Sequence, residues 1–128
     1  EEAQSARVEL PSGGWVMFET TQAMTTIDVN SGGHDAPARA VNLEAAQIIA
    51  RQVRLRGLGG LIAIDFIDMR ESADCEPVLR ALDEGFAGDK QPVRIGPISE
   101  FGVVEMTRRR GGMTLTQNLQ QIGPATDA

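Results

Sequence analysis

Four oxygen-bearing side chains stand in apolar, strand-like stretches, and their types and spacing suit metal-assisted chemistry. Asp28 and Asn30 alternate with apolar residues in Ile-Asp-Val-Asn, so they point to the same side of an extended segment. Asp65 and Asp68 stand among large apolar residues in Ile-Asp-Phe-Ile-Asp-Met. Burying an unpaired carboxylate is very costly, so each such Asp lies at an exposed strand end, is paired, or binds a cation.

Two carboxylates and a carboxamide at one place would give the hard oxygen ligands that Mg²⁺ prefers. Asp28 and Asp65 are the candidate metal ligands, with Asn30 and Asp68 as supporting side chains. The chemistry would be metal-assisted phosphoryl transfer, with the ion polarising a phosphate and helping to generate hydroxide. The spacing leaves an alternative open, in which each Asp caps a turn or pairs with an arginine and Asp68 begins the following loop.

A βαβ pattern is expected to bring the two aspartates together. Residues 24–29 are rich in β-branched side chains, residues 42–56 have apolar positions at helical spacing, and residues 61–65 form a continuous apolar run. Neighbouring strands joined by such a helix run parallel, with a right-handed crossover. Asp28 and Asp65 would then emerge at the C-terminal edge of the sheet, where open α/β sheets place ligands.

The remaining pattern completes an α/β fold, a mixed twisted sheet with one βαβ unit and two main helices. Asn42 is placed to cap the first helix, and Gly57 follows that helix as its C′ residue. A second helix is predicted at 76–87, with Pro77 in its first turn. Further strands are predicted at 7–10, 15–19, 93–95 and 102–106.

Length and composition limit the classes of protein. The 128 residues suit one domain at 7–110, between a disordered start at 1–6 and a polar tail at 111–128. A net charge of −6 argues against coating duplex nucleic acid or an anionic membrane through bulk charge. The single Cys75 allows no internal disulfide, which fits a reducing cytoplasm. No apolar run approaches the ~20 residues of a membrane helix, and the first residues lack the basic region of a signal peptide.

Arginine is the dominant cation, and two clusters of it are candidates for holding phosphates of a single strand near the carboxylates. The alternative is that one cluster compensates the helix dipole at the end of the first helix and the other forms a solvated strand end. Among the few aromatic residues, Phe66 follows Asp65 directly and is predicted to touch a base. The candidate RNA-contacting side chains are Arg51, Arg54, Phe66, Arg108, Arg109 and Arg110.

Six longer motifs follow one another between about residues 10 and 110. They are Ser-Gly-Gly-Trp at 12–15, Thr-Gln-Ala-Met-Thr-Thr-Ile-Asp-Val-Asn-Ser-Gly at 21–32, Asn-Leu-Glu-Ala-Ala at 42–46, Ile-Ala-Arg-Gln-Val-Arg-Leu-Arg at 49–56, Gly-Gly-Leu-Ile-Ala-Ile-Asp-Phe-Ile-Asp-Met at 59–69 and Ile-Ser-Glu-Phe-Gly-Val-Val-Glu-Met-Thr-Arg-Arg-Arg at 98–110. In composition and order they resemble the ribonuclease E/G family. In that family this region is the DNase I-like subdomain, which holds the catalytic metal site.

The resemblance implies roles for the candidate residues. Asp28 and Asp65 would be the Mg²⁺-ligating aspartates and Asn30 their supporting side chain. The implied activity is that of a single-strand-specific endoribonuclease, which cuts A/U-rich RNA and leaves 5′-phosphate and 3′-hydroxyl ends. The implied processes are rRNA maturation and mRNA decay.

Several departures from the family pattern limit what the resemblance implies. The loop between Ser31 and Asn42 is shorter and lacks the family's acidic stretch. The Cys-Pro-x-Cys that joins subunits through zinc is absent, so no zinc link is expected and a homodimer stays open. Pro92 stands where the family's 5′-monophosphate sensor borrows an arginine. With no OB-fold or RNase H-like part, the chain would be at most the catalytic subdomain, and its partners would be single-stranded RNA and the missing RNA-binding modules.

Two other functions remain open at this point. One is a non-catalytic RNA-binding or oligomerisation module that retains the fold. The other is a general Mg²⁺-dependent phosphatase, which the long motifs do not support.

Overall fold

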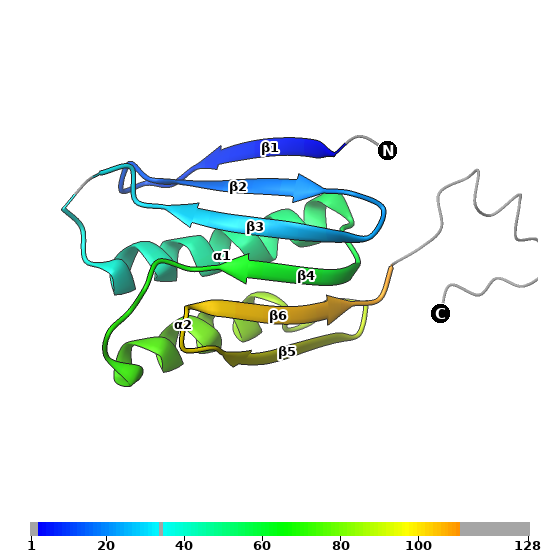
Figure 1. Ribbon diagram of the computed structural model, residues 1–128. Coiled ribbons are helices and arrows are strands. Elements are labelled where there is room, and N and C mark those ends of the chain that lie inside the picture. Colours follow the sequence, from blue (N-terminus) through cyan, green and yellow to red (C-terminus); the bar gives the residue numbers. More distant parts are fainter. Residues whose placement is uncertain (1–2, 34, 111–128) are drawn as a thin grey trace, which may run out of the picture.

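Six strands and two helices make up the described part of the chain, residues 3–33 and 35–110 of the computed structural model. The strands are β1 (Gln4–Glu9), β2 (Trp15–Thr20), β3 (Met24–Asn30), β4 (Gly60–Asp65), β5 (Val93–Ile98) and β6 (Val103–Arg108), and the helices are α1 (Ala38–Arg56) and α2 (Ser72–Gly85). The strands form one mixed sheet in the order β1-β2-β3-β4-β6-β5. Both helices lie against one face of it and the other face is open, as Figure 1 shows. The predicted α/β class is confirmed.

Alternation of apolar and polar side chains along the strands produces the core. In β3, Ile27 and Val29 are buried while Asp28 between them is exposed. In β4, Ile62 and Ile64 are buried in the same way. The buried face packs against apolar positions of α1 that recur at helical spacing. These positions are Val41, Ala45, Ala46, Ile49, Ala50 and Val53.

The predicted βαβ unit is present, because β3 and β4 are parallel neighbours joined through α1. On one side of this unit, β2 runs antiparallel to both of its neighbours, β1 and β3. On the other side, β6 runs antiparallel to both β4 and β5. The two helices approach closely at Gly85, where an added Cβ would overlap the Cβ of Ala50.

Both helices begin earlier than predicted. α1 starts at Ala38, so Asn42 lies in its second turn and is not its N-cap; Pro37 occupies that position without a side-chain bond. α2 starts at Ser72, and Pro77 therefore lies inside the helix and not in its first turn. Proline removes only its own hydrogen bond to the carbonyl four residues earlier, and Asp74 in the first turn favours the earlier start.

The start of the chain is more ordered than predicted. β1 begins at Gln4, which pairs with Thr20, because the backbone of β2 offers hydrogen bonds to a strand at that edge. Disorder across 1–6 is thus wrong for residues 4–6. The predicted tail at 111–128 lies outside the described residues. None of the helices in the described part is long and apolar enough to cross a membrane.

Candidate metal site on the open face of the sheet

Asp28 and Asp65 are direct partners in the parallel ladder of β3 and β4. Direct partners project to the same face, and adjacent strands are about 4.8 Å apart, so the two carboxylates lie side by side. Both side chains are exposed on the open face, while their preceding neighbours Ile27 and Ile64 are buried against the helices. The predicted meeting of the two aspartates at one edge of the sheet is confirmed.

No partner neutralises this pair in the described part of the chain. Neither Asp28 nor Asp65 takes part in any of the side-chain hydrogen bonds or ion pairs found among residues 3–33 and 35–110. Partial burial raises the pKa of Asp28 above its ordinary value of 3.8, and the nearby charge of Asp65 raises it further. Turn capping and pairing with an arginine therefore do not explain these residues within those ranges.

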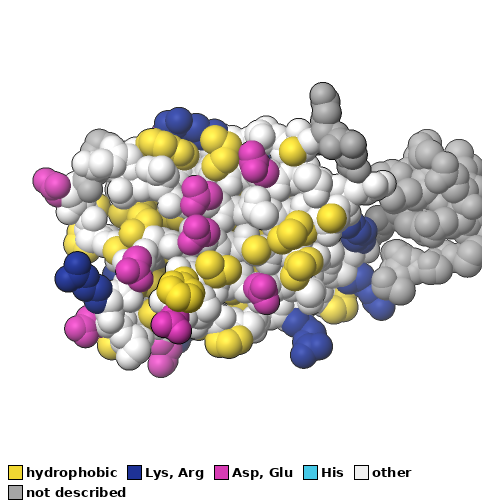
Figure 2. Space-filling view, viewed as in Figure 1, with side chains coloured by type: hydrophobic (Ala, Val, Ile, Leu, Met, Phe, Trp, Pro, Cys, Tyr) yellow, Lys and Arg dark blue, Asp and Glu magenta, His cyan; other side chains and the backbone are white. Residues whose placement is uncertain are grey.

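The residues beside the pair on the open face are apolar. Met17 of β2 pairs with Asp28, and Val103 of β6 pairs with Asp65. Figure 2 views this open face and shows acidic side chains over the ends of β3 and β4, with Lys and Arg side chains at the rim. The result is a local concentration of negative charge that a cation can occupy favourably.

Arg7 is the nearest arginine in the same row across the sheet, since it pairs with Met17. Its guanidinium carbon lies 3.9 Å from the centroid of the Trp15 ring, and its Nε donates to Glu9 at 2.7 Å. Arg7 is therefore held by other groups on β1 and β2.

Asn30 lies on the same face as Asp28, two residues further along β3. Its Oδ1 accepts a hydrogen bond from the backbone N–H of Gly32 at 2.8 Å, which fixes the direction of the side chain. Gly14 packs against the same backbone, because a Cβ at Gly14 would overlap the carbonyl oxygen of Asn30. The Ser-Gly-Gly turn thus supports the end of β3, a role that the motif alone did not reveal.

Asp68 is exposed in the loop between β4 and α2, beyond the end of the sheet. No group of three or more His, Cys, Asp or Glu side chains suited to a metal occurs among residues 3–33 and 35–110, so Asp68 is not gathered with the pair. The buried Asn42 positions this loop by donating to the carbonyl of Ile67 at 2.8 Å and accepting its N–H at 3.0 Å. The prediction that Asn42 caps the helix missed this role, because Asn42 is buried in α1 and bonds to a residue far along the chain.

The burial of Phe66 does not fit the predicted contact with a base. Its side chain is 3% exposed and belongs to the hydrophobic core. The reason is the alternation of side chains at the end of β4: if Asp65 points to the open face, the next residue points toward the helices.

Arg108 is also unsuited to the predicted contact with RNA. It is 6% exposed, and its guanidinium donates to both carboxylate oxygens of Asp89, at 2.8 and 3.0 Å. A third bond runs from Nη1 to the carbonyl oxygen of Leu58 at 2.8 Å. This side chain is bound inside the fold, because a buried guanidinium needs partners for its charge and its N–H groups.

Arg109 and Arg110 are exposed. They follow β6, at the end of the strands opposite to the end that carries the carboxylates. Arg108 pairs with Gly60, and Asp65 lies five residues further along β4, or about 16 Å. These arginines are not brought beside the pair.

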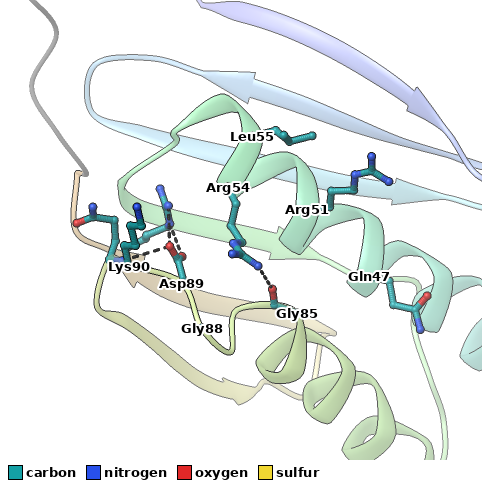
Figure 3. A pocket seen from close by; sticks show the side chains of 10 residues that line it. Gln47, Arg51, Arg54, Leu55, Gly85, Gly88, Asp89 and Lys90 are labelled. Carbon is teal, nitrogen blue, oxygen red and sulfur yellow. Dashed lines mark hydrogen bonds and ion pairs between the residues drawn. The ribbon is translucent and has the colours of Figure 1, made fainter.

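Arg51 and Arg54 lie on α1 and therefore on the helix side of the sheet. With Lys90 and Gln91 they line a pocket of about 610 Å³ between the end of α1 and the segment that joins α2 to β5. Figure 3 shows Arg54 reaching across to Gly85, whose carbonyl oxygen accepts a bond from Nη1 at 3.1 Å. Arg51 and Arg54 thus lie on the opposite face of the sheet from the aspartate pair.

The fold and the site together define a class of protein. The class is that of proteins with an open α/β sheet. Here two carboxylates, without a counter-charge in the described part of the chain, stand at the C-terminal ends of adjacent parallel strands, the place where such sheets bind ligands.

Comparisons with known proteins specify the family. Residues 1–111 match the Ribonuclease E/G family. Ribonuclease E of Nostoc sp. (strain PCC 7120) is 42% identical over 97% of this chain and 19% of its own length. Ribonuclease G of Escherichia coli (strain K12) is 44% identical over 86% of this chain and 24% of its own length. The chain belongs to the Ribonuclease E/G family, and it spans about a fifth to a quarter of the length of these relatives.

Proposed function

We propose that this chain is the catalytic subdomain, DNase I-like in type, of a Mg²⁺-dependent endoribonuclease. The observation that carries the proposal is the direct pairing of Asp28 with Asp65 on the open face, without a counter-charge among residues 3–33 and 35–110. The relatives named Ribonuclease E and Ribonuclease G support an RNA substrate. The proposed substrate is single-stranded, A/U-rich RNA in rRNA processing and mRNA decay, in the cytoplasm.

The donor set fits a hard divalent cation. Asp28 and Asp65 would hold it, since carboxylate oxygens are the ligands that Mg²⁺ prefers and the mutual repulsion of the pair is relieved by a cation. When bound, Mg²⁺ supplies positive charge against phosphate oxygens and lowers the pKa of coordinated water. Asn30 keeps the end of β3 in one conformation through its bond to Gly32.

The side chains at this end of the sheet limit how RNA can be held there. The two carboxylates repel phosphate, so the strand is held there only through a cation or through apolar and stacking contacts. Arg51 and Arg54 would contact RNA only on the helix face, away from the pair. The RNA-binding modules of the family are therefore the proposed partners that bring the strand to the carboxylates. A homodimer, if one forms, is proposed to have no zinc link.

The test combines a metal-binding and a cleavage measurement on Asp65→Asn. In the 128-residue chain, Mg²⁺ should raise the melting temperature of the unmodified protein by mass action and leave that of Asp65→Asn unchanged. For cleavage, the chain replaces the matching segment of E. coli Ribonuclease G, so that the rest of that relative supplies the RNA-binding modules. Asp65→Asn in this chimera should lower Mg²⁺-dependent cutting of a single-stranded A/U-rich RNA by more than about a hundredfold.

Glu105→Gln is the matched control, because it removes one exposed acid from the same face without touching the pair. Full activity of Asp65→Asn would refute the catalytic proposal. RNA binding without any metal-dependent cutting by the chimera would favour the second function, a non-catalytic RNA-binding or oligomerisation module.

A further inference from the structure

Phe101 is the one phenylalanine whose ring lies outside the core in the described residues. Its exposed fraction is 77%, whereas Phe18, Phe66 and Phe86 are 2%, 3% and 6% exposed. Trp15 has one ring face covered by the guanidinium of Arg7. An exposed aromatic ring of this size offers a flat apolar surface on which another ring can stack.

The position of Phe101 connects it to the carboxylate pair. It stands two residues before Val103, the cross-strand partner of Asp65. The next residue, Gly102, accepts a hydrogen bond at its carbonyl oxygen from the backbone N–H of Phe66, at 3.0 Å. Phe101 therefore lies in the turn that is hydrogen-bonded to the residue after Asp65, at the C-terminal end of β4.

The turn that carries Phe101 is held firmly. The Oγ of Ser99 accepts the backbone N–H of Phe101 at 3.3 Å and that of Val103 at 3.1 Å. The backbone of Ser99 also bonds to Gly102 at 3.0 Å and to Val103 at 2.9 Å. Gly102 has φ +85°, and its hydrogen fits against the carbonyl of Phe66 where a Cβ would be tight, at 3.1 Å. The ring is therefore presented from a fixed backbone.

The surroundings of Phe101 favour a base over a phosphate. Glu100 beside it is exposed and acidic, and the aspartate pair adds negative charge nearby. Figure 2 shows hydrophobic surface over the turn between β5 and β6, close to the acidic side chains at the end of β4. Any of the four bases can stack on such a ring. A base carries no negative charge, so the nearby carboxylates do not repel it as they repel phosphate.

We propose that Phe101 is a stacking platform for a base next to the scissile phosphate, which sets the register of single-stranded RNA over Asp28 and Asp65. The inference rests on the proposed function, since it assumes that RNA crosses the open face. It assigns to this turn a positioning role that neither the carboxylates nor the arginines perform.

The experiment measures binding of the 128-residue chain to a single-stranded A/U decamer and to an abasic decamer, with Mg²⁺ at low salt. Phe101→Ala should weaken binding of the decamer about fivefold to a hundredfold, which is the range for loss of one base–aromatic stack. Binding of the abasic strand should not change. Phe101→Trp should retain the affinity, and 2-aminopurine in the decamer should lose its fluorescence on binding to the unmodified chain but less so to Phe101→Ala.

Leu55→Ala is the matched control, because Leu55 is 68% exposed on α1, on the other side of the sheet. Equal affinities of Phe101→Ala and Leu55→Ala would overturn the inference. So would full affinity of Phe101→Leu, which would show that the contact with RNA does not need an aromatic ring. Failure of the unmodified chain to bind either strand would overturn it as well. The chimera with Asp65→Asn decides the proposed function separately, by metal-dependent cutting.

Discussion

Two carboxylates on opposite faces of the sheet meet opposite environments. Asp89, on the helix side, receives two hydrogen bonds from Arg108, and this bonding lowers the pKa of Asp89 below its ordinary value of 3.8. Asp28, on the open face, is partly buried beside Asp65, and both effects raise its pKa. The fold stabilises the ionised form of Asp89, whereas it destabilises the ionised form of Asp28.

The difference shows how charge is divided between structure and function here. Asp89 and Arg108 are 5% and 6% exposed and satisfy each other, so removing either leaves a buried charge. Asp28 and Asp65 are exposed like charges that have no counter-charge among residues 3–33 and 35–110, so an added cation would stabilise them. The first pair holds β6 to the segment after α2, while the second is available to a ligand.

Asp89→Ala should have the largest effect on stability. It leaves the guanidinium of Arg108 buried without its counter-charge, so the free energy of unfolding should fall by about 3–5 kcal/mol in urea denaturation. Because the pKa of Asp89 is lowered, its contribution is present above the pKa of the unfolded chain and is lost as pH falls through the folded value. The exposed Asp83→Ala on α2 is the control, and a loss below about 1 kcal/mol at Asp89 would contradict a structural role for the pair.

Asn42→Ala should have an intermediate effect on stability. Asn42 is a buried polar residue of α1, and its side chain bonds to the backbone of Ile67. The substitution leaves the N–H and the carbonyl of Ile67 without their partners, which should cost about 1–3 kcal/mol in the same measurement. The exposed Gln47→Ala on the same helix gives the baseline. If the two variants unfold alike, the loop after β4 does not depend on Asn42.

Asp28→Asn should have the smallest effect and the opposite sign. Its removal relieves repulsion with Asp65, so the free energy of unfolding at pH 7 without metal should rise by less than about 1 kcal/mol. The raised pKa means that protonation of Asp28 favours the folded state, so the difference from the unmodified chain should shrink as pH falls through that pKa. A decrease in stability at pH 7, with Glu105→Gln as the reference, would show that Asp28 has a stabilising partner.

Much of the fold could be predicted because local patterns and burial agree. The β-branched run of β3, the apolar run of β4 and the helical spacing between them were enough to place Asp28 and Asp65 at the same edge of the sheet, whereas their direct pairing came from the structure. The helix starts were missed because Asn42 and Pro77 are typical of helix N-termini, whereas here one makes long-range bonds and the other is tolerated inside the helix. At Asn42 the local preference was overridden by a tertiary contact.

The arginines show the limit of sequence patterns most clearly. Adjacent arginines at 108–110 share one sequence motif, yet Arg108 is buried against Asp89 while Arg109 and Arg110 are exposed. Nothing in the local sequence reveals that Asp89, nineteen residues earlier, is the partner. Likewise, Arg51 and Arg54 could be assigned to one helix but not to the face opposite the carboxylates.

The sequence by itself determined the class of fold, the parallel βαβ unit and the two aspartates at its edge, because periodicity and chain connectivity depend only on the order of residues. Tertiary structure alone decided which charges are neutralised. It buried Arg108 with Asp89, turned Phe66 into the core and left Phe101 exposed in the turn next to the end of β4. Burial and pairing depend on residues far apart in the chain, and these residues meet only when the helices pack against the sheet.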